Sequence, residues 1–213
     1  MSACALVRRE TAALHSKVEA HLELTAAEVP RSAVWVLVDA LADLAGAVTG
    51  LAERWVPGAP DEAGLLHRLG WPRRRRRLEL LDADRRTLGP ETSKPPAGRL
   101  PGNTAGLVGA LYVLEGSTLG GVLIDRELRR QAWYRASPLP SLTGYGADTG
   151  RLWRSFRAAA DEWAAAVPGR DRAMAEAASA AFRRVDLRMT GSTARLVDDL
   201  PEAVSAGLTG RGA

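Results

Sequence analysis

An all-α fold is predicted by the spacing of the apolar residues. Leu14, Val18 and Leu22 recur at i, i+4 and i+8, and comparable helical spacing runs along nearly the whole chain. The alternating β-branched pattern that strands need is absent from the sequence. With 213 residues and 46% hydrophobic composition, the chain can bury one sizeable core, and no linker divides it. We therefore expect a single domain, whose core covers about residues 5–190 and whose tail, about 198–213, frays.

Proline and glycine set the expected ends of the helices. Pro30 precedes the second helix, and Gly89 ends a basic helix that begins after Pro72. Clusters of turn-forming residues predict loops at 90–102 and 137–148. In chain order, the expected helices cover residues 5–24, 31–55, 61–69, 72–88, 104–133, 149–167 and 171–190.

Three glycines interrupt the apolar helix that is expected at 104–133. Gly116, Gly120 and Gly121 each give up roughly 1 kcal/mol against alanine, so about 3 kcal/mol of helix propensity is lost. Ordinary packing would be served better by Ala, so something must need the missing side chains. The candidates are a kink, a close helix contact, or a flat ligand that lies on the exposed backbone.

His15 is the candidate metal ligand among the three histidines. On one continuous helix of about 100° per residue, His15 shares a face with Arg8, Thr11 and Glu19, whereas His21 lies about 120° away. That face offers the neutral ring nitrogen of His15 as a metal ligand and, about 10 Å along the axis, the cation of Arg8, which is suited to bind a carboxylate. An iron porphyrin requires both, because it carries a metal and carboxylates. Glu19 either fixes the ring tautomer, by accepting a proton from the second nitrogen or from an ordered water, or is an ordinary surface carboxylate.

Five consecutive arginines, residues 73–77, form the most basic stretch of the chain. Wrapped on a helix they cover all faces, and no aromatic residues are interleaved as stacking platforms for bases. The 25 acidic residues dilute the field of the 29 basic ones and leave a net charge of +4. We therefore expect a solvated face or a docking surface for an acidic partner, and no nucleic-acid binding.

Cysteine content and hydropathy favour a cytoplasmic protein. Cys4 is the only cysteine, so neither an intrachain disulfide nor a thiolate cluster can form. The first residues lack a sustained apolar core, and no stretch reaches 18 uncharged apolar residues. We expect neither a signal peptide nor a membrane span.

Three segments together resemble the bacterial heme oxygenases, in the order and at the spacing of that family. They are RETAALHSKVE at 9–19, LYVLEGSTLGG at 111–121 and GYGADTGRLWRSF at 144–156, with Ala181 and Phe182 as a further match. The similarity covers most of residues 5–190 and is greatest to the group that accompanies bacteriophytochromes. It implies an all-α fold in which heme lies between a proximal helix, the first one, and a kinked distal helix that carries the glycines.

The resemblance also implies roles for individual residues. His15 matches the proximal iron ligand. Gly116, Gly120 and Gly121 match distal glycines, whose missing side chains let the backbone lie against the porphyrin and press bound oxygen toward its edge. Arg154 matches a basic residue that pairs with a heme propionate, and Arg8 occupies a second basic position. Phe182 and Tyr145 match residues that line the heme pocket.

Two positions depart from the pattern of many relatives. Ser117 stands where family members of the animal type carry an aspartate that orders water, although serine is common in the bacteriophytochrome-associated group. A hydroxyl donates and accepts hydrogen bonds but supplies no charge, so we expect Ser117 to order the distal water. Val122 stands where many relatives have glutamine, which removes one polar contact of the distal helix.

The activity that the resemblance implies is oxidative opening of heme b to biliverdin, with release of carbon monoxide and ferrous iron. Heme is then both substrate and cofactor, and dioxygen and electrons are consumed. The glycines of 116–121 follow no strand, so they are no dinucleotide fingerprint, and an external ferredoxin or reductase is expected to supply the electrons. A bacteriophytochrome is a candidate client for the biliverdin.

Two alternatives remain open at this point. A non-catalytic heme carrier or sensor of the same fold would keep the pocket without turnover, and Val122 favours it modestly. Diiron oxidases and thiaminase-like proteins also share the fold. A dinuclear site, however, needs several Glu, Asp and His ligands on facing helices, at spacings that the three histidines do not supply.

Overall fold

The protein is all-α, as the apolar spacing predicts. The structure, a computed structural model, describes residues 1–22, 28–89 and 98–198, and every regular element in those ranges is helical. The elements are α1 (Ala3–Glu10), α2 (Ala12–Glu19), α3 (Arg31–Arg54), η1 (Pro60–Glu62), α4 (Leu65–Arg68), α5 (Trp71–Arg74), α6 (Arg76–Leu88), α7 (Thr104–Leu128), α8 (Ala132–Ala136), η2 (Pro140–Thr143), η3 (Gly146–Asp148), α9 (Thr149–Ala165) and α10 (Arg170–Asp198).

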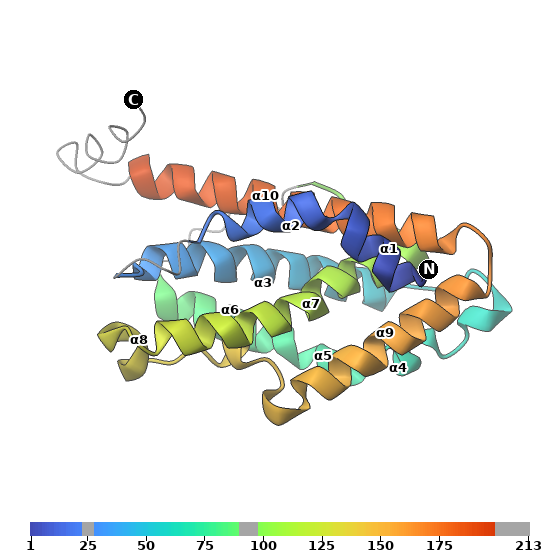
Figure 1. Cartoon of the computed structure of the whole chain (residues 1–213), viewed down its shortest axis with the longest axis horizontal. Helices are drawn as coiled ribbons and strands as arrows, with labels where there is room; N and C mark the ends of the chain where they lie inside the picture. Colours follow the sequence, from blue (N-terminus) through green and yellow to red (C-terminus); the bar gives the residue numbers. More distant parts are fainter. Residues whose placement is uncertain (23–27, 90–97, 199–213) are drawn as a thin grey trace.

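Three long helices, α3, α7 and α10, form the centre of the molecule. α10 packs against both α7 and α3, and it also contacts α1 and α2, which lie along it in Figure 1. α3 is buried almost all round from Val34 to Ala45, as expected for a helix that is apolar on every face. α6 covers α3, and α9 lies against α1 and α7. The buried apolar residues of these helices join in one hydrophobic cluster.

α3 and α7 are long and apolar enough to cross a membrane by length and composition alone. In the fold they serve as core helices, with 67% and 56% of their most apolar stretches buried.

The single helix predicted at 5–24 is wrong, because the chain breaks at Thr11. Thr11 has φ −101° and ψ 1°, and its buried hydroxyl donates a hydrogen bond of 2.7 Å to the carbonyl of Val7. Arg8 therefore lies on α1 and His15 on α2. The common helix face that was expected for these two residues does not exist.

Other boundaries differ in smaller ways. The helix predicted at 104–133 ends at Leu128 and is followed by the separate α8, while the last helix runs on to Asp198. The predicted basic helix is divided into α5 and α6, and the segment 61–69 into η1 and α4. The connection at 137–148 contains two short 3-10 helices. Residues 90–97 of the predicted loop and 199–213 of the predicted tail lie outside the described residues.

The contact between α7 and α10 depends on Gly109. A Cβ atom there would lie 2.7 Å from the carbonyl oxygen of Met174 and 2.7 Å from the amide nitrogen of Ala178. Real Cβ atoms do not approach backbone atoms this closely, so any side chain at this position would push the two helices apart.

Gly109→Ala should therefore destabilise the protein by roughly 1–3 kcal/mol, the usual cost of overpacking a core. Gly46 in α3 is the matched control, because a Cβ there would meet nothing within 4 Å. Gly46→Ala should stabilise by about 0.5–1 kcal/mol through helix propensity. Urea unfolding followed by circular dichroism measures both, and an unchanged midpoint for Gly109→Ala would contradict the close contact.

Candidate functional site

One face of α7 presents apolar side chains and glycines to the outside. Tyr112, Gly116, Leu119 and Leu123 follow one another at i, i+4, i+7 and i+11, a spacing that places them in one stripe along the helix. Leu119 is 40% exposed and Leu123 54% exposed, and neighbouring Gly120 is exposed as well. An exposed apolar stripe in the middle of a core helix marks a surface that another group covers.

The three predicted distal glycines do not share one environment. A Cβ at Gly120 would meet nothing within 4 Å, and one at Gly116 would reach only the ring of Trp153, at an ordinary 3.7 Å. A Cβ at Gly121 would lie 2.8 Å from the carbonyl oxygen of Leu142 in η2. Packing within the protein thus explains Gly121, whereas nothing in the described protein requires glycine at 116 or 120.

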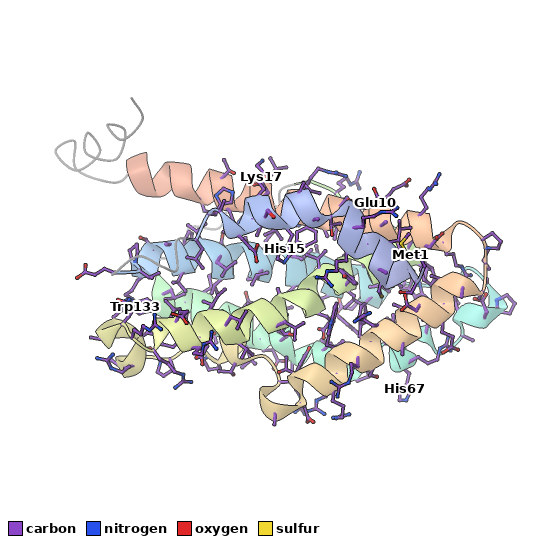
Figure 2. The ribbon with its side chains drawn as sticks, in the orientation of Figure 1. Met1, Glu10, His15, Lys17, His67 and Trp133 are labelled. Carbon is purple, nitrogen blue, oxygen red and sulfur yellow. The ribbon has the colours of Figure 1, made fainter. Side chains whose placement is uncertain are left out.

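His15 projects from α2 on the side opposite to Lys17 (Figure 2). α2 has no fully buried residue, and the His15 side chain is 57% exposed. Its ring packs edge-on against Phe182 of α10, with the ring centroids 5.6 Å apart. The structure therefore brings together His15 and Phe182, two residues singled out in different parts of the sequence.

Glu19 lies where it can control the tautomer of His15. The Nδ1 atom of His15 is 3.3 Å from Oε2 of Glu19, one turn later in α2. A carboxylate beside Nδ1 favours the proton on that nitrogen, which leaves the lone pair of Nε2 for a metal.

Aromatic side chains border the open stripe of α7 at its N-terminal end. Tyr112 lies 5.2 Å from Trp153, and Trp153 stacks on Phe156 at 5.8 Å, all between ring centroids. Burial raises the pKa of Tyr112, and the nearby Arg157 and Arg8 oppose this shift. The Tyr112 hydroxyl donates to the carbonyl of Cys4 in α1 at 3.5 Å, so the helix that carries Arg8 contacts this end of the stripe, although it is not the helix of His15.

Arg154 is exposed on α9, one residue from Trp153. The role predicted for it, pairing with a propionate, requires only an accessible cation, and this stays a prediction.

Two of the five arginines at 73–77 are buried, so the predicted solvated face is wrong for them. Arg74 forms a buried ion pair with Glu115 of α7 and donates to the carbonyl of Leu152 at 2.9 Å. Arg77, 3% exposed, donates to the carbonyl of Leu114 and, at 2.9 Å, to the hydroxyl of Ser117. The other three, Arg73, Arg75 and Arg76, are exposed.

Glu115 and Tyr145 complete this buried polar cluster. The Tyr145 hydroxyl donates to Oε1 of Glu115 at 2.8 Å, while Arg74 occupies Oε2. Tyr145 was predicted to line the pocket, and the structure directs its hydroxyl into the cluster. The sequence analysis missed the pairing of Glu115 with Arg74, because the two residues are 41 positions apart in the chain. The only local signal was a charged residue inside an apolar helix.

Ser117 points toward the cluster and away from the open stripe. It follows Gly116 by about 100° around the helix, and its hydroxyl donates to the carbonyl of Leu114 at 2.8 Å while accepting from Arg77. Both directions of hydrogen bonding are in use, so the geometry gives no support to a water-ordering role.

The histidines stand apart from one another. His21 Nε2 lies 3.0 Å from Asp186, and His67 is exposed on α4. Within residues 1–22, 28–89 and 98–198, no three His, Cys, Asp or Glu side chains gather where they could hold a metal ion. A metal at His15 would have to be held mainly by ligands that are not protein side chains, as in a porphyrin.

Arg74→Met tests the buried cluster, because it leaves Glu115 buried without its cation. The expected loss is about 3–5 kcal/mol of stability, the usual cost of breaking a buried ion pair by removing one partner. Arg75→Met, next in the chain but exposed, should change stability by no more than about 0.5 kcal/mol. Equal urea midpoints for the two variants would contradict the pairing.

Comparison with known proteins gives no match: no family model fits the chain, and neither the curated proteins nor the solved structures contain a significant counterpart. The family resemblance therefore stays a prediction, and the case for a ligand site rests on the geometry of α2, α7 and α10.

Proposed function

We propose that this protein is a heme oxygenase, which opens heme to biliverdin and releases carbon monoxide and ferrous iron. Dioxygen and electrons from an external ferredoxin or reductase are consumed. The family resemblance of the three sequence segments motivates the proposal, and the geometry of α7 supports it independently.

The observation that carries the proposal is the contrast among the glycines of α7. At Gly109 and Gly121, backbone atoms lie less than 3 Å from the position of an added Cβ. At Gly116 an added Cβ would meet only the Trp153 ring, at an ordinary 3.7 Å, and at Gly120 it would meet nothing within 4 Å. Both open glycines still cost helix stability, roughly 1 kcal/mol each. A flat ligand against the backbone explains that cost, because a methyl group at 116 or 120 would stand in its way.

Residues of α2 and α10 suit the same ligand. His15 offers Nε2, with Glu19 holding the proton on Nδ1, and Phe182 packs against the ring and limits its rotation. Bound heme would supply the iron at which dioxygen reacts and is itself the substrate. The chain's own task is to bind its flat face, orient it and keep water away.

Exposed arginines suit the propionate carboxylates of the proposed heme. Arg8 and Arg154 are exposed, and the helix that carries Arg8 contacts the Tyr112 end of the stripe. Exposed guanidinium groups bind carboxylates in a bidentate manner at modest desolvation cost. We infer that the propionates lie toward this end. A cytoplasmic location and a bacteriophytochrome as client are part of the same proposal.

Hemin reconstitution tests the function directly. Hemin is added to the purified chain, then ascorbate or ferredoxin with its reductase is supplied in air, and the pigment is separated by chromatography. Loss of the Soret band with appearance of biliverdin is expected. A Soret band that never bleaches would favour a heme carrier or sensor, and the absence of a Soret band would contradict the heme site.

His15→Ala should abolish ligation of the heme iron by histidine and turnover, because His21 pairs with Asp186 and His67 lies on α4. Added imidazole should restore part of the histidine-type spectrum by occupying the vacated position. Ferric and ferrous absorbance spectra measure this, and Lys17→Ala on the opposite side of α2 is the control. An unaltered spectrum of the His15 variant would refute the ligand assignment.

Gly120→Ala should have opposite effects on the free protein and on hemin binding. The free protein should gain about 0.5–1 kcal/mol, because the added methyl group meets nothing. Hemin affinity should fall about tenfold, from steric overlap with the bound ligand. Gly46→Ala should give the same gain in stability with unchanged hemin affinity. A Gly120 variant that binds hemin as well as the Gly46 variant would contradict contact between ligand and backbone.

A further inference from the structure

The buried cluster beneath α7 carries an uncompensated positive charge. Arg74 and Arg77 are both buried, and so is the carboxylate of Glu115. Arg74 and the Tyr145 hydroxyl take the two oxygens of Glu115. The hydrogen bonds of Arg77 go to neutral acceptors, the carbonyl of Leu114 and the hydroxyl of Ser117.

Arg77 remains charged in spite of its burial. Loss of solvation lowers the pKa of its guanidinium to about 10, which leaves the group protonated at neutral pH. Its Nε is buried without a hydrogen-bond partner. Within the described part of the chain, no carboxylate forms an ion pair with Arg77.

Packing alone gives no reason to keep this cation. A buried charge without a counter-ion costs stability, and an apolar side chain of similar volume is often tolerated as well or better. The acceptors of Arg77 do not depend on it either, because the Leu114 carbonyl lies inside an α-helix and also accepts from the Ser117 hydroxyl.

The position of Arg77 places its charge behind the open stripe of α7. Its partners Leu114 and Ser117 flank Gly116, so only the backbone of α7 separates the guanidinium from the open stripe. A helix backbone has a Cα radius of about 2.3 Å, which places the charge within about 10 Å of a group on the opposite side. Protein on every side of Arg77 keeps solvent ions from screening it at this range.

We propose that Arg77 is a buried electrostatic element that makes the open face of α7 favour anionic ligands over neutral ones. This inference rests on the proposed heme site, where a small ligand would bind on the side of the heme that faces α7. Arg77 touches neither the heme nor that ligand and acts through the field across the helix.

The test compares an anion with a neutral ligand on the ferric, hemin-reconstituted full chain. Azide and imidazole are titrated separately by the shift of the Soret band. In Arg77→Met the azide affinity should fall about tenfold, as expected for two unit charges about 10 Å apart at an effective dielectric constant of about 20. The imidazole affinity should change less than about twofold, because the pocket keeps its shape.

Two further variants separate charge from structure. Arg77→Lys keeps a cation and should retain most of the azide affinity. Arg75→Met removes an exposed arginine two residues away and should leave both affinities unchanged. The azide effect of Arg77→Met should persist at high salt, because the charge is buried.

The possible results distinguish failure of this inference from failure of the proposed function. If Arg77→Met lowers the azide and imidazole affinities equally, Arg77 acts by maintaining the shape of the pocket and the proposal is wrong. If neither affinity falls, Arg77 has no electrostatic role. Neither result contradicts the heme site itself. A wild-type protein that gives no Soret band with hemin would overturn the proposed function and this inference with it.

Discussion

The buried carboxylate of Glu115 is the interaction on which the placement of α7 depends. It lies in an otherwise apolar helix and is held from one side by Arg74 of α5 and from the other by the Tyr145 hydroxyl. An unpaired carboxylate at this depth would be prohibitively costly, so α5, α7 and the turn before η3 must come together. The rotation of α7 about its own axis is fixed by the same contacts.

The glycines of α7 have different surroundings along the length of the helix. Neighbouring backbone approaches closely at Gly109 and Gly121, and it does not at Gly116 and Gly120. One helix therefore combines tight packing with an open surface. A rotation of α7 by one residue, about 100°, would carry Glu115 away from Arg74 and the Tyr145 hydroxyl.

Local sequence patterns predict the helices well and their tertiary partners poorly. Apolar periodicity and proline predict α3 and α9 nearly to their ends, and they predict the start of α7 but not its end. The break at Thr11 depends on a hydroxyl that bonds the backbone, and helical spacing carries no sign of it. The burial of Arg74 depends on Glu115, 41 residues away. Likewise Gly120 and Gly121 are adjacent in sequence, and only the carbonyl of Leu142 distinguishes their environments.

The break at Thr11 also makes α2 a separate unit of local stability. α2 is two turns long, has no fully buried side chain, and packs chiefly along α10. Segments with so few buried contacts open at a free energy well below that of global unfolding. Hydrogen exchange in α2 is thus expected to be faster than in α3 or α7. The element that carries His15 can therefore open locally while the core stays folded, and in the proposed heme oxygenase such opening would be a route for heme to enter and for biliverdin to leave.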